Sequence, residues 1–162
     1  MTFEIFGHRG TNFYPDHSAE AHSYAMDWGA DWAEFDIQMT SDGVLVVAHD
    51  TGTIPTTTLA RLQATSPGTM TLDQALDLVA AKEAETGREI KISIEMKSPA
   101  AHLAKGLDMP KALVDLLVAR GVTSTEDISV SSFETAATQR LANTLYPAAG
   151  ISTAPAIAPS PM

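Results

Sequence analysis

The sequence predicts an α/β fold of the (β/α)8 barrel type, of which its 162 residues supply only the first half. Short apolar runs alternate with longer segments of helical period, a pattern typical of parallel strands joined by helices. Two predicted strands carry charged residues on one face, whereas the strands of a doubly wound sheet are apolar on both faces. Inward side chains of a barrel account for this polar face. A complete barrel takes about 200 to 250 residues, so we expect about four to five β/α units plus one hairpin strand.

The first β/α unit lies at the N-terminus. Residues 3–6 form an apolar strand that ends at Gly7. Ser18 then caps a helix that continues to about Trp28, and Gly29 ends it in a left-handed conformation.

The next segment, residues 31–39, alternates with a period of two and is therefore predicted to be a strand. Its polar face carries Trp32, Glu34, Asp36 and Gln38. Ser41-Asp42-Gly43 is a turn signal, and the apolar run 44–48 forms a second strand that ends at His49-Asp50.

The central segment begins with residues 51–70, which are rich in threonine, lack periodicity and are predicted to be a loop. Thr71 and Gln74 form a capping box for a helix that ends at Gly87. Residues 90–96 form the next strand, in which isoleucines alternate with polar residues. Its polar face carries Lys91, Ser93, Glu95 and Lys97.

A helix from about Pro110 to Gly121, a strand over 128–133 and a helix over 135–145 complete the pattern. The helix at Pro110 is expected to bury Leu113, Val114, Leu117 and Val118, and four aromatic residues are assigned to core or helix packing: Trp28, Trp32, Phe35 and Phe133. Gly150-Ile151-Ser152 could begin a further strand. We therefore divide the chain into a partial barrel domain, 1–147, and an Ala/Pro-rich tail, 148–162.

Composition excludes several classes of function. With 20 acidic and 10 basic residues, the net charge of −10 argues against nucleic acid and anionic membranes as partners. The absence of cysteine excludes disulfides, thiolate metal sites and a cysteine nucleophile. The N-terminus lacks the features of a secretory signal, and no apolar run approaches the about 20 residues that span a bilayer. We expect a soluble, cytoplasmic protein that acts on a small molecule.

Three carboxylates are expected to converge at one end of the sheet. Glu34 and Asp36 share a face of one strand, and Glu95 occupies the equivalent face of the next parallel strand. Like charges held this close must bind protons or a cation, and an all-oxygen set suits Mg²⁺, Ca²⁺ or Mn²⁺ rather than zinc. The alternative is that these acidic residues simply face solvent at strand ends.

His8 and His49 each follow an apolar strand directly and can serve as general acid and base near neutral pH. The alternative for either is a structural hydrogen bond. That structural role is the expectation for the three remaining histidines, although the first of them lies close to the first loop: His17, His22 and His102.

Arg9 and Lys97 add positive charge beside the carboxylates, which suits a phosphate group. The alternative for Lys97 is an internal salt bridge with Glu95 or Asp36.

Several motifs together resemble the glycerophosphodiester phosphodiesterase family. They are His8-Arg9-Gly10, Pro15, Gly29-Ala30-Asp31, Glu34-Phe35-Asp36, Thr40-Ser41-Asp42-Gly43, Val46-Val47-Ala48-His49-Asp50, Ile94-Glu95-Met96-Lys97 and Ser132-Phe133. The resemblance runs from about Phe3 to Pro147 and covers the N-terminal part of the family's domain.

The resemblance implies a (β/α)8 barrel that uses a divalent cation, Mg²⁺ or Ca²⁺, to hydrolyse glycerophosphodiesters to glycerol 3-phosphate and an alcohol. It implies that His8 and His49 are the catalytic acid and base. It also implies that the metal is held by Glu34, Asp36 and Glu95, and that Arg9 and Lys97 lie near the phosphate.

The chain also departs from the family pattern. It has Pro15-Asp16-His17-Ser18 where the family usually has Pro-Glu-Asn-Thr. The segment 51–70 is shorter than the insertion that the family commonly has at this place, and the later strands of the barrel are absent. The alternative to an enzyme is therefore a non-catalytic truncated barrel that acts as a binding or assembly module, and an incomplete barrel favours a homo-oligomer. A further alternative keeps the fold and changes the substrate to a lysophospholipid or phosphoinositide headgroup.

Overall fold

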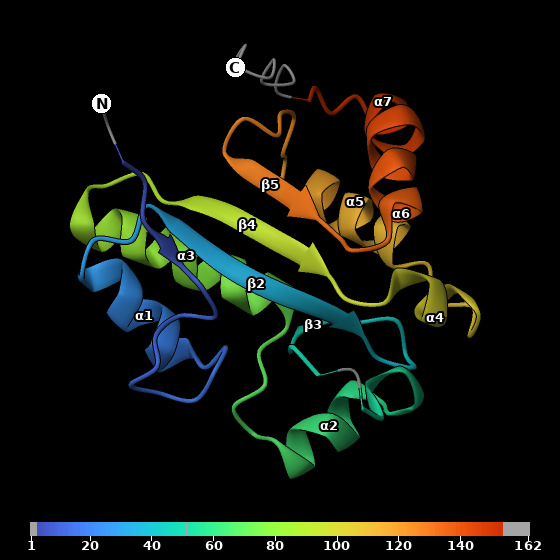
Figure 1. Ribbon diagram of the computed structural model, residues 1–162, viewed down its shortest axis with the longest axis horizontal. Helices are drawn as coiled ribbons and strands as arrows, with labels where there is room; N and C mark the ends of the chain where they lie inside the picture. Colours follow the sequence, from blue (N-terminus) through green and yellow to red (C-terminus); the bar gives the residue numbers. More distant parts are fainter. Residues whose placement is uncertain (1–2, 51, 154–162) are drawn as a thin grey trace, which may run out of the picture.

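The structure is a computed structural model that describes residues 3–50 and 52–153 (Figure 1). Its sheet has the order β1-β2-β4-β5 with all of these neighbours parallel, and a short β3 pairs antiparallel with β2. The strands are β1 (Phe6–Gly7), β2 (Trp32–Met39), β3 (Leu45–Val47), β4 (Lys91–Met96) and β5 (Ile128–Ser131). The predicted parallel α/β fold with one hairpin strand is confirmed.

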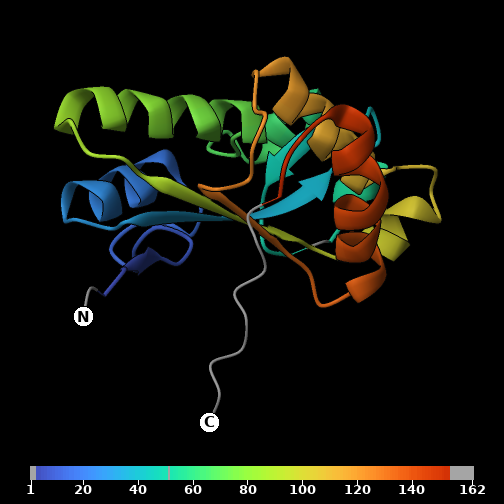
Figure 2. The same cartoon turned by 90° about the horizontal axis from the view of Figure 1, so that it is seen from above.

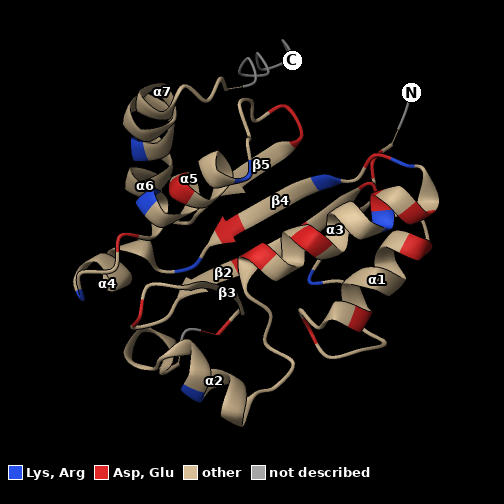
Figure 3. Cartoon of the chain, turned by 180° about the vertical axis from the view of Figure 1, so that it is seen from behind, with Lys and Arg blue, Asp and Glu red and all other residues tan. Residues whose placement is uncertain are grey.

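The main helices lie along one side of the sheet, where Figure 2 shows α3 and α5 together. The helices are α1 (Ala19–Asp27), α2 (Leu59–Thr65), α3 (Leu72–Thr86), α4 (Pro99–Leu103), α5 (Met109–Ala119), α6 (Thr135–Arg140) and α7 (Tyr146–Ala149), with a 3-10 turn η1 (Ile54–Thr56) and a π-helical turn η2 (Leu141–Leu145). Acidic side chains are spread along α1 and α3, in agreement with the net negative charge (Figure 3).

The predicted helix caps are present. The Ser18 hydroxyl accepts a hydrogen bond from the backbone N–H of Ala21 and so begins α1. Thr71 and Gln74 form both hydrogen bonds of the capping box at the start of α3. Gly87 ends α3 with a φ of 67°, which glycine adopts without steric cost.

The alternation along the central strands separates an apolar core from a polar site. Phe35, Ile37 and Ile94 are completely buried in the core, together with Leu72 of α3 and Leu117 of α5. Successive side chains of a strand point to opposite faces. The charged residues of β2 and β4 therefore lie on the face turned away from these helices.

Some expectations from the sequence are wrong. Residues 51–70 are not a plain loop, because η1 and α2 lie within them. The Thr58 hydroxyl caps α2, which is seven residues long and buries none of them. Trp28 and Phe133 are not core residues, since 76% and 93% of their surfaces are exposed. Val118 is 47% exposed because it lies beyond the buried stripe of α5.

The predicted boundary between residues 147 and 148 falls within α7. Ile151 is buried in the core, and Ser152 forms a parallel bridge with Ser124, so the end of the described chain packs beside the start of β5. The rest of the predicted tail, 154–162, lies outside the described residues. In the part of the chain that is described, every helix is too short or too polar to cross a bilayer.

Candidate active site

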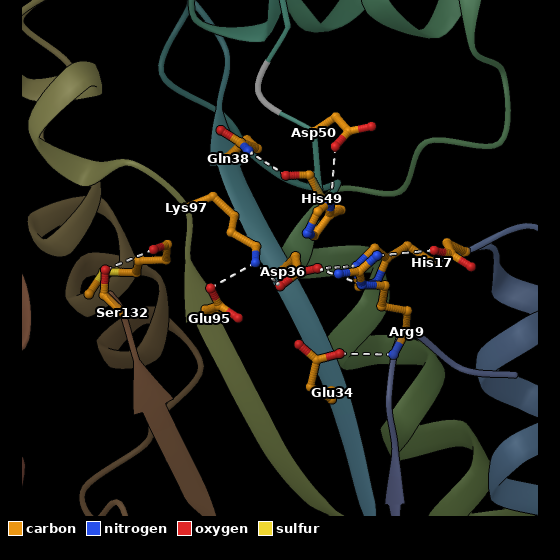
Figure 4. A network of polar contacts seen from close by, with 12 residues as sticks. Arg9, His17, Glu34, Asp36, Gln38, His49, Asp50, Glu95, Lys97 and Ser132 are labelled. Carbon is orange, nitrogen blue, oxygen red and sulfur yellow. Dashed lines mark hydrogen bonds and ion pairs between the residues drawn. The ribbon is translucent and has the colours of Figure 1, made fainter. Parts of the chain in front are cut away.

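Charged side chains from separate segments meet at the carboxyl ends of the parallel strands (Figure 4). Arg9 follows β1, Asp36 lies in β2, His49 follows β3 and Lys97 follows β4. Parallel strands place their carboxyl ends at one edge of the sheet, which is where the active sites of β/α barrels lie.

The loop between β1 and α1 is held in a strained conformation. Gly10 has a φ of 91°, and a Cβ atom there would lie 2.5 Å from the carbonyl carbon of Ala21. Arg9 and His17 also adopt positive φ values, 52° and 62°, which are uncommon for residues other than glycine. The N–H of His17 donates to the carbonyl of Arg9 at 3.0 Å. Close packing of the loop on α1 thus fixes both side chains at the site.

Asp36 is the centre of the polar network and is only 1% exposed. Its Oδ2 lies 3.0 Å from His17 Nε2 and 3.1 Å from Arg9 Nε, and its Oδ1 lies 3.1 Å from Lys97 Nζ. Burial alone would raise the pKa of Asp36, but hydrogen bonds from His17 and Lys97 outweigh it and hold that pKa well below its usual range. Asp36 is therefore a permanent negative charge.

Glu34 is buried on the same strand face, two residues from Asp36. Its Oε2 accepts a hydrogen bond of 2.8 Å from the backbone N–H of Arg9. Burial raises the pKa of Glu34 and the charge of Asp36 adds to that effect, while the Arg9 N–H opposes it. A raised pKa means that the negative charge on Glu34 is not fully compensated, so the carboxylate favours a proton or a bound cation.

Glu95 lies opposite Asp36 in the pairing of β2 with β4. Lys97 Nζ bridges the two carboxylates, 2.7 Å from Glu95 Oε1 and 3.1 Å from Asp36 Oδ1. Burial would lower the pKa of Lys97, but these two hydrogen bonds raise it, so Lys97 stays charged. The internal salt bridge considered from the sequence is thus present. Lys97 also lies 5.9 Å from the centre of the exposed Phe133 ring.

The donor set of the cluster fits a divalent cation. One donor atom each from His17, Glu34 and Asp36 can be chosen so that all lie within 4.8 Å of one another, and all three residues are buried. Burial of the Glu34 carboxylate, which raises its pKa, also favours a cation at this place. The carboxylates do not face solvent as the alternative from the sequence supposed. Glu95 lies next to this cluster but pairs with Lys97 instead of joining it.

The two histidines proposed from the sequence flank the cluster. His49 Nδ1 lies 2.9 Å from Asp50 Oδ1, and the His49 carbonyl accepts a hydrogen bond of 3.1 Å from Gln38 Nε2. Because Asp50 occupies Nδ1, proton transfer by His49 would use Nε2. His8 is exposed at the end of β1 and, when protonated, lowers the pKa of Glu34 electrostatically.

A groove of about 870 Å³ opens beside the cluster. Its lining includes Arg9, His17 and His49, together with Leu62 and residues 66–69. The short segment that the sequence left as a loop therefore forms one wall of the groove. The groove places the exposed edge of the polar network in contact with solvent, where a small molecule can reach it.

For His17 the sequence favoured a structural hydrogen bond, although the residue lies close to the first loop; the structure shows that hydrogen bond, to Asp36, and also places His17 among the candidate metal donors. Its ring contacts Asp36 on one side and His22 on the other, with 3.4 Å between His17 Nδ1 and His22 Nε2. His22 is 1% exposed; burial and the neighbouring His17 lower the pKa of His22 to about 3, so it is neutral. His102 is structural as expected, since its Nε2 accepts a hydrogen bond from the N–H of Met39.

The family model and the curated relatives that this chain matches point to one family, and the solved structures share its fold. Residues 8–161 match the model of the glycerophosphoryl diester phosphodiesterase family. A curated Mycobacterium tuberculosis protein, "Probable glycerophosphodiester phosphodiesterase 1", is 30% identical over 124 residues, which are 60% of this chain and 44% of that protein. A Bacillus altitudinis glycerophosphodiester phosphodiesterase is 46% identical over 48 residues, 29% of this chain and 20% of its own length. The chain thus spans less than half of these relatives.

Solved structures share the fold. A Silicibacter pomeroyi protein described as "Putative glycerophosphoryl diester phosphodiesterase" superposes with a TM-score of 0.71 at 21% identity, over 94% of this chain and 64% of that one. An Agrobacterium tumefaciens glycerophosphodiester phosphodiesterase gives a TM-score of 0.67 at 24% identity, over 86% of this chain and 61% of that one. The sheet and its helices thus correspond to part of these α/β barrels. Given the family match along nearly its whole length, the chain belongs to the glycerophosphoryl diester phosphodiesterase family.

Proposed function

We propose that this chain carries the metal site and the acid–base residues of a metal-dependent phosphoric diester hydrolase. Its substrates would be glycerophosphodiesters, cleaved to glycerol 3-phosphate and an alcohol. The observation that carries the proposal is that Glu34 and Asp36, two buried carboxylates, meet Arg9, Lys97 and His49 beside an open groove. The family match supports the same reaction class.

The side chains have distinct roles in this proposal. A divalent cation on the carboxylates would neutralise charge on the phosphate and polarise it. Glu95, whose Oε1 lies 2.7 Å from Lys97 Nζ, would hold that lysine beside the substrate phosphate. Arg9, whose Nε already lies 3.1 Å from Asp36 Oδ2, can present the rest of its guanidinium group to a phosphate oxygen.

His8 and His49 would move the protons. One histidine accepts the proton of the glycerol hydroxyl as that oxygen forms a bond to phosphorus, and the other gives a proton to the alcohol as its bond to phosphorus breaks. This step leaves a cyclic phosphate of glycerol. Water then opens that ring, and the reverse proton transfers return both histidines to their starting protonation states. His49 is suited to this because Asp50 holds its Nδ1 at 2.9 Å and orients the ring.

The test is release of glycerol 3-phosphate from sn-glycero-3-phosphoethanolamine by the 162-residue chain, with a divalent cation and then with excess chelator. Chelation should abolish release, and His8→Ala and His49→Ala should each slow it by about 10² to 10⁴-fold. Lys111→Ala, on the exposed face of α5, should leave the rate unchanged. Absence of release with every divalent cation would contradict the proposal.

The second candidate is a non-catalytic barrel segment that binds or assembles with a partner. It is favoured by β5, which among the described residues pairs with β4 alone and ends beside the exposed Phe133. Exposed strand edges pair readily with other chains. Retention of metal binding without any release of glycerol 3-phosphate would favour this candidate.

A further inference from the structure

We infer that His17 supplies a nitrogen ligand to the cation held by Glu34 and Asp36, so that the site prefers nitrogen-binding transition metals such as Co²⁺ or Zn²⁺ to Mg²⁺ and Ca²⁺. The inference rests on the metal site of the proposed function and names the chemistry of its ligands. It differs from the expectation from the sequence, which was an all-oxygen set of Glu34, Asp36 and Glu95.

The distances suit direct ligation by His17. Its Nε2 lies 3.0 Å from Asp36 Oδ2, and the chosen donors of the two carboxylates and the imidazole all lie within 4.8 Å of one another. Ligands about 2.1 Å from a tetrahedral ion lie about 3.4 Å apart. The three donors are therefore spaced so that one cation could bind all of them after the side chains adjust, including Arg9 and Lys97, which contact Asp36 at 3.1 Å.

The backbone and a second ring hold His17 in this position. Its left-handed φ of 62° and its hydrogen bond to the Arg9 carbonyl fix the main chain. His22 lies behind the ring, 3.4 Å from His17 Nδ1, and the two rings stack with centroids 5.6 Å apart. A partner on the far nitrogen is the usual arrangement of a metal-bound histidine, because it orients the ring and leaves the other nitrogen for the ion.

The third carboxylate of the expected oxygen set is occupied elsewhere. Lys97 Nζ lies 2.7 Å from Glu95 Oε1, closer than it lies to Asp36. The buried cluster therefore contains two carboxylates and one imidazole. Imidazole nitrogen binds zinc, iron, nickel and copper well, whereas Mg²⁺ and Ca²⁺ take oxygen ligands almost exclusively.

The test uses Mn²⁺ as a paramagnetic probe of the intact chain. Electron spin echo modulation of bound Mn²⁺ should show coupling to an imidazole ¹⁴N, and His17→Asn should remove this coupling while Mn²⁺ stays bound. Asparagine tolerates the left-handed conformation of His17, so this variant should fold, as a thermal melt can verify. His8→Asn, which changes an exposed imidazole near the same site, should keep the coupling.

A calorimetric titration with Zn²⁺ and with Mg²⁺ adds a second readout. The ratio of the Zn²⁺ affinity to the Mg²⁺ affinity should be lower in His17→Asn than in the wild type by about tenfold or more. Mn²⁺ binding without nitrogen coupling, or with coupling unchanged in His17→Asn, would overturn this inference and leave the proposed hydrolase intact. Failure to bind any divalent cation would overturn both.

Discussion

His17 Nε2 lies 3.0 Å from Asp36 Oδ2 and so joins the loop after β1 to the centre of the sheet. Asp36 also contacts Arg9 of the same loop and Lys97, which follows β4. The folding of the first loop and the assembly of the charged cluster are therefore coupled. A substitution in the loop should change metal binding by the cluster, and a substitution in the cluster should change the stability of the fold.

Replacing Lys97 with methionine should destabilise the metal-free chain. Lys97 is the cation between Asp36 and Glu95, and its removal takes the counter-charge from Glu95 and leaves Asp36 with Arg9 and His17. We expect the free energy of unfolding in urea with chelator to fall by about 2–3 kcal/mol. A divalent cation should restore more stability to Lys97→Met than to the wild type.

The matched control is Lys111→Met, which removes an exposed pair with Asp115 on α5. This change should cost about 0.5 kcal/mol or less and should not depend on metal. Equal losses in the two variants would show that the bridge contributes no more than a surface ion pair.

Gly10→Ala should disrupt the first loop. The new Cβ would lie 2.5 Å from the Ala21 carbonyl carbon, and the φ of 91° is unsuitable for alanine. We expect a loss of about 3 kcal/mol in stability and of most metal affinity, because Arg9 and His17 would be displaced. Gly87→Ala has a similar φ of 67° but open space around it, so it should cost only about 1 kcal/mol and leave metal affinity unchanged. Similar effects of both changes on metal binding would contradict this account.

Tyr146 should make the chain sensitive to alkali. No described residue lies within hydrogen-bonding distance of its buried hydroxyl, and burial raises the pKa of Tyr146 from 10.0 to about 12. The unfolded chain therefore loses this proton at a lower pH than the folded chain does. Below pH 10 the hydroxyl is protonated in both states, and this pKa difference leaves the free energy of unfolding unchanged. As the pH rises from 10 to about 12, the free energy of unfolding falls by about 1.4 kcal/mol per pH unit.

Tyr146→Phe tests this by urea unfolding at several pH values. The variant should be about 1 kcal/mol more stable than the wild type at pH 7, because no unpaired hydroxyl is buried, and should lack this part of the alkaline slope. A variant that is less stable at neutral pH would indicate that the hydroxyl has a partner.

The exposed edge of β5 predicts self-association of the chain. Exposed strand edges and aromatic side chains such as Phe133 favour contacts between copies. Sedimentation velocity over a range of concentrations should show a mass that rises with concentration. A monomer at every concentration would contradict this expectation.

Local signals in the sequence predicted much of the fold. The capping box of Thr71 and Gln74, the stop at Gly87 and the two-residue period of β2 depend on neighbouring residues alone, and all three are confirmed. The helix α2 was missed because seven residues are too few for a hydrophobic period to stand out, and none of them is buried. The exposure of Phe133 was missed because residue type alone does not show which face of a strand end is covered.

The site was predictable only in part. The placement of Glu34, Asp36 and Glu95 on the same face of neighbouring strands follows from the two-residue period and from the order of the strands along the chain. The register confirms that Asp36 and Glu95 are opposite each other. The position of His17 beside Asp36 could not be predicted, because it depends on a left-handed backbone and on the fold of a loop without periodicity. The replacement of the family's asparagine at this position was the one available signal.

The central claim is that β2 and the first loop form one divalent cation site, and the most direct measurement is calorimetric titration of the chain with Mn²⁺. The account predicts one ion bound per chain, a melting temperature that rises with Mn²⁺, and an affinity at least about tenfold weaker in Glu34→Gln. Glu20→Gln, on the exposed first turn of α1, should match the wild type. An absence of binding, or binding that Glu34→Gln leaves unchanged, would contradict the account.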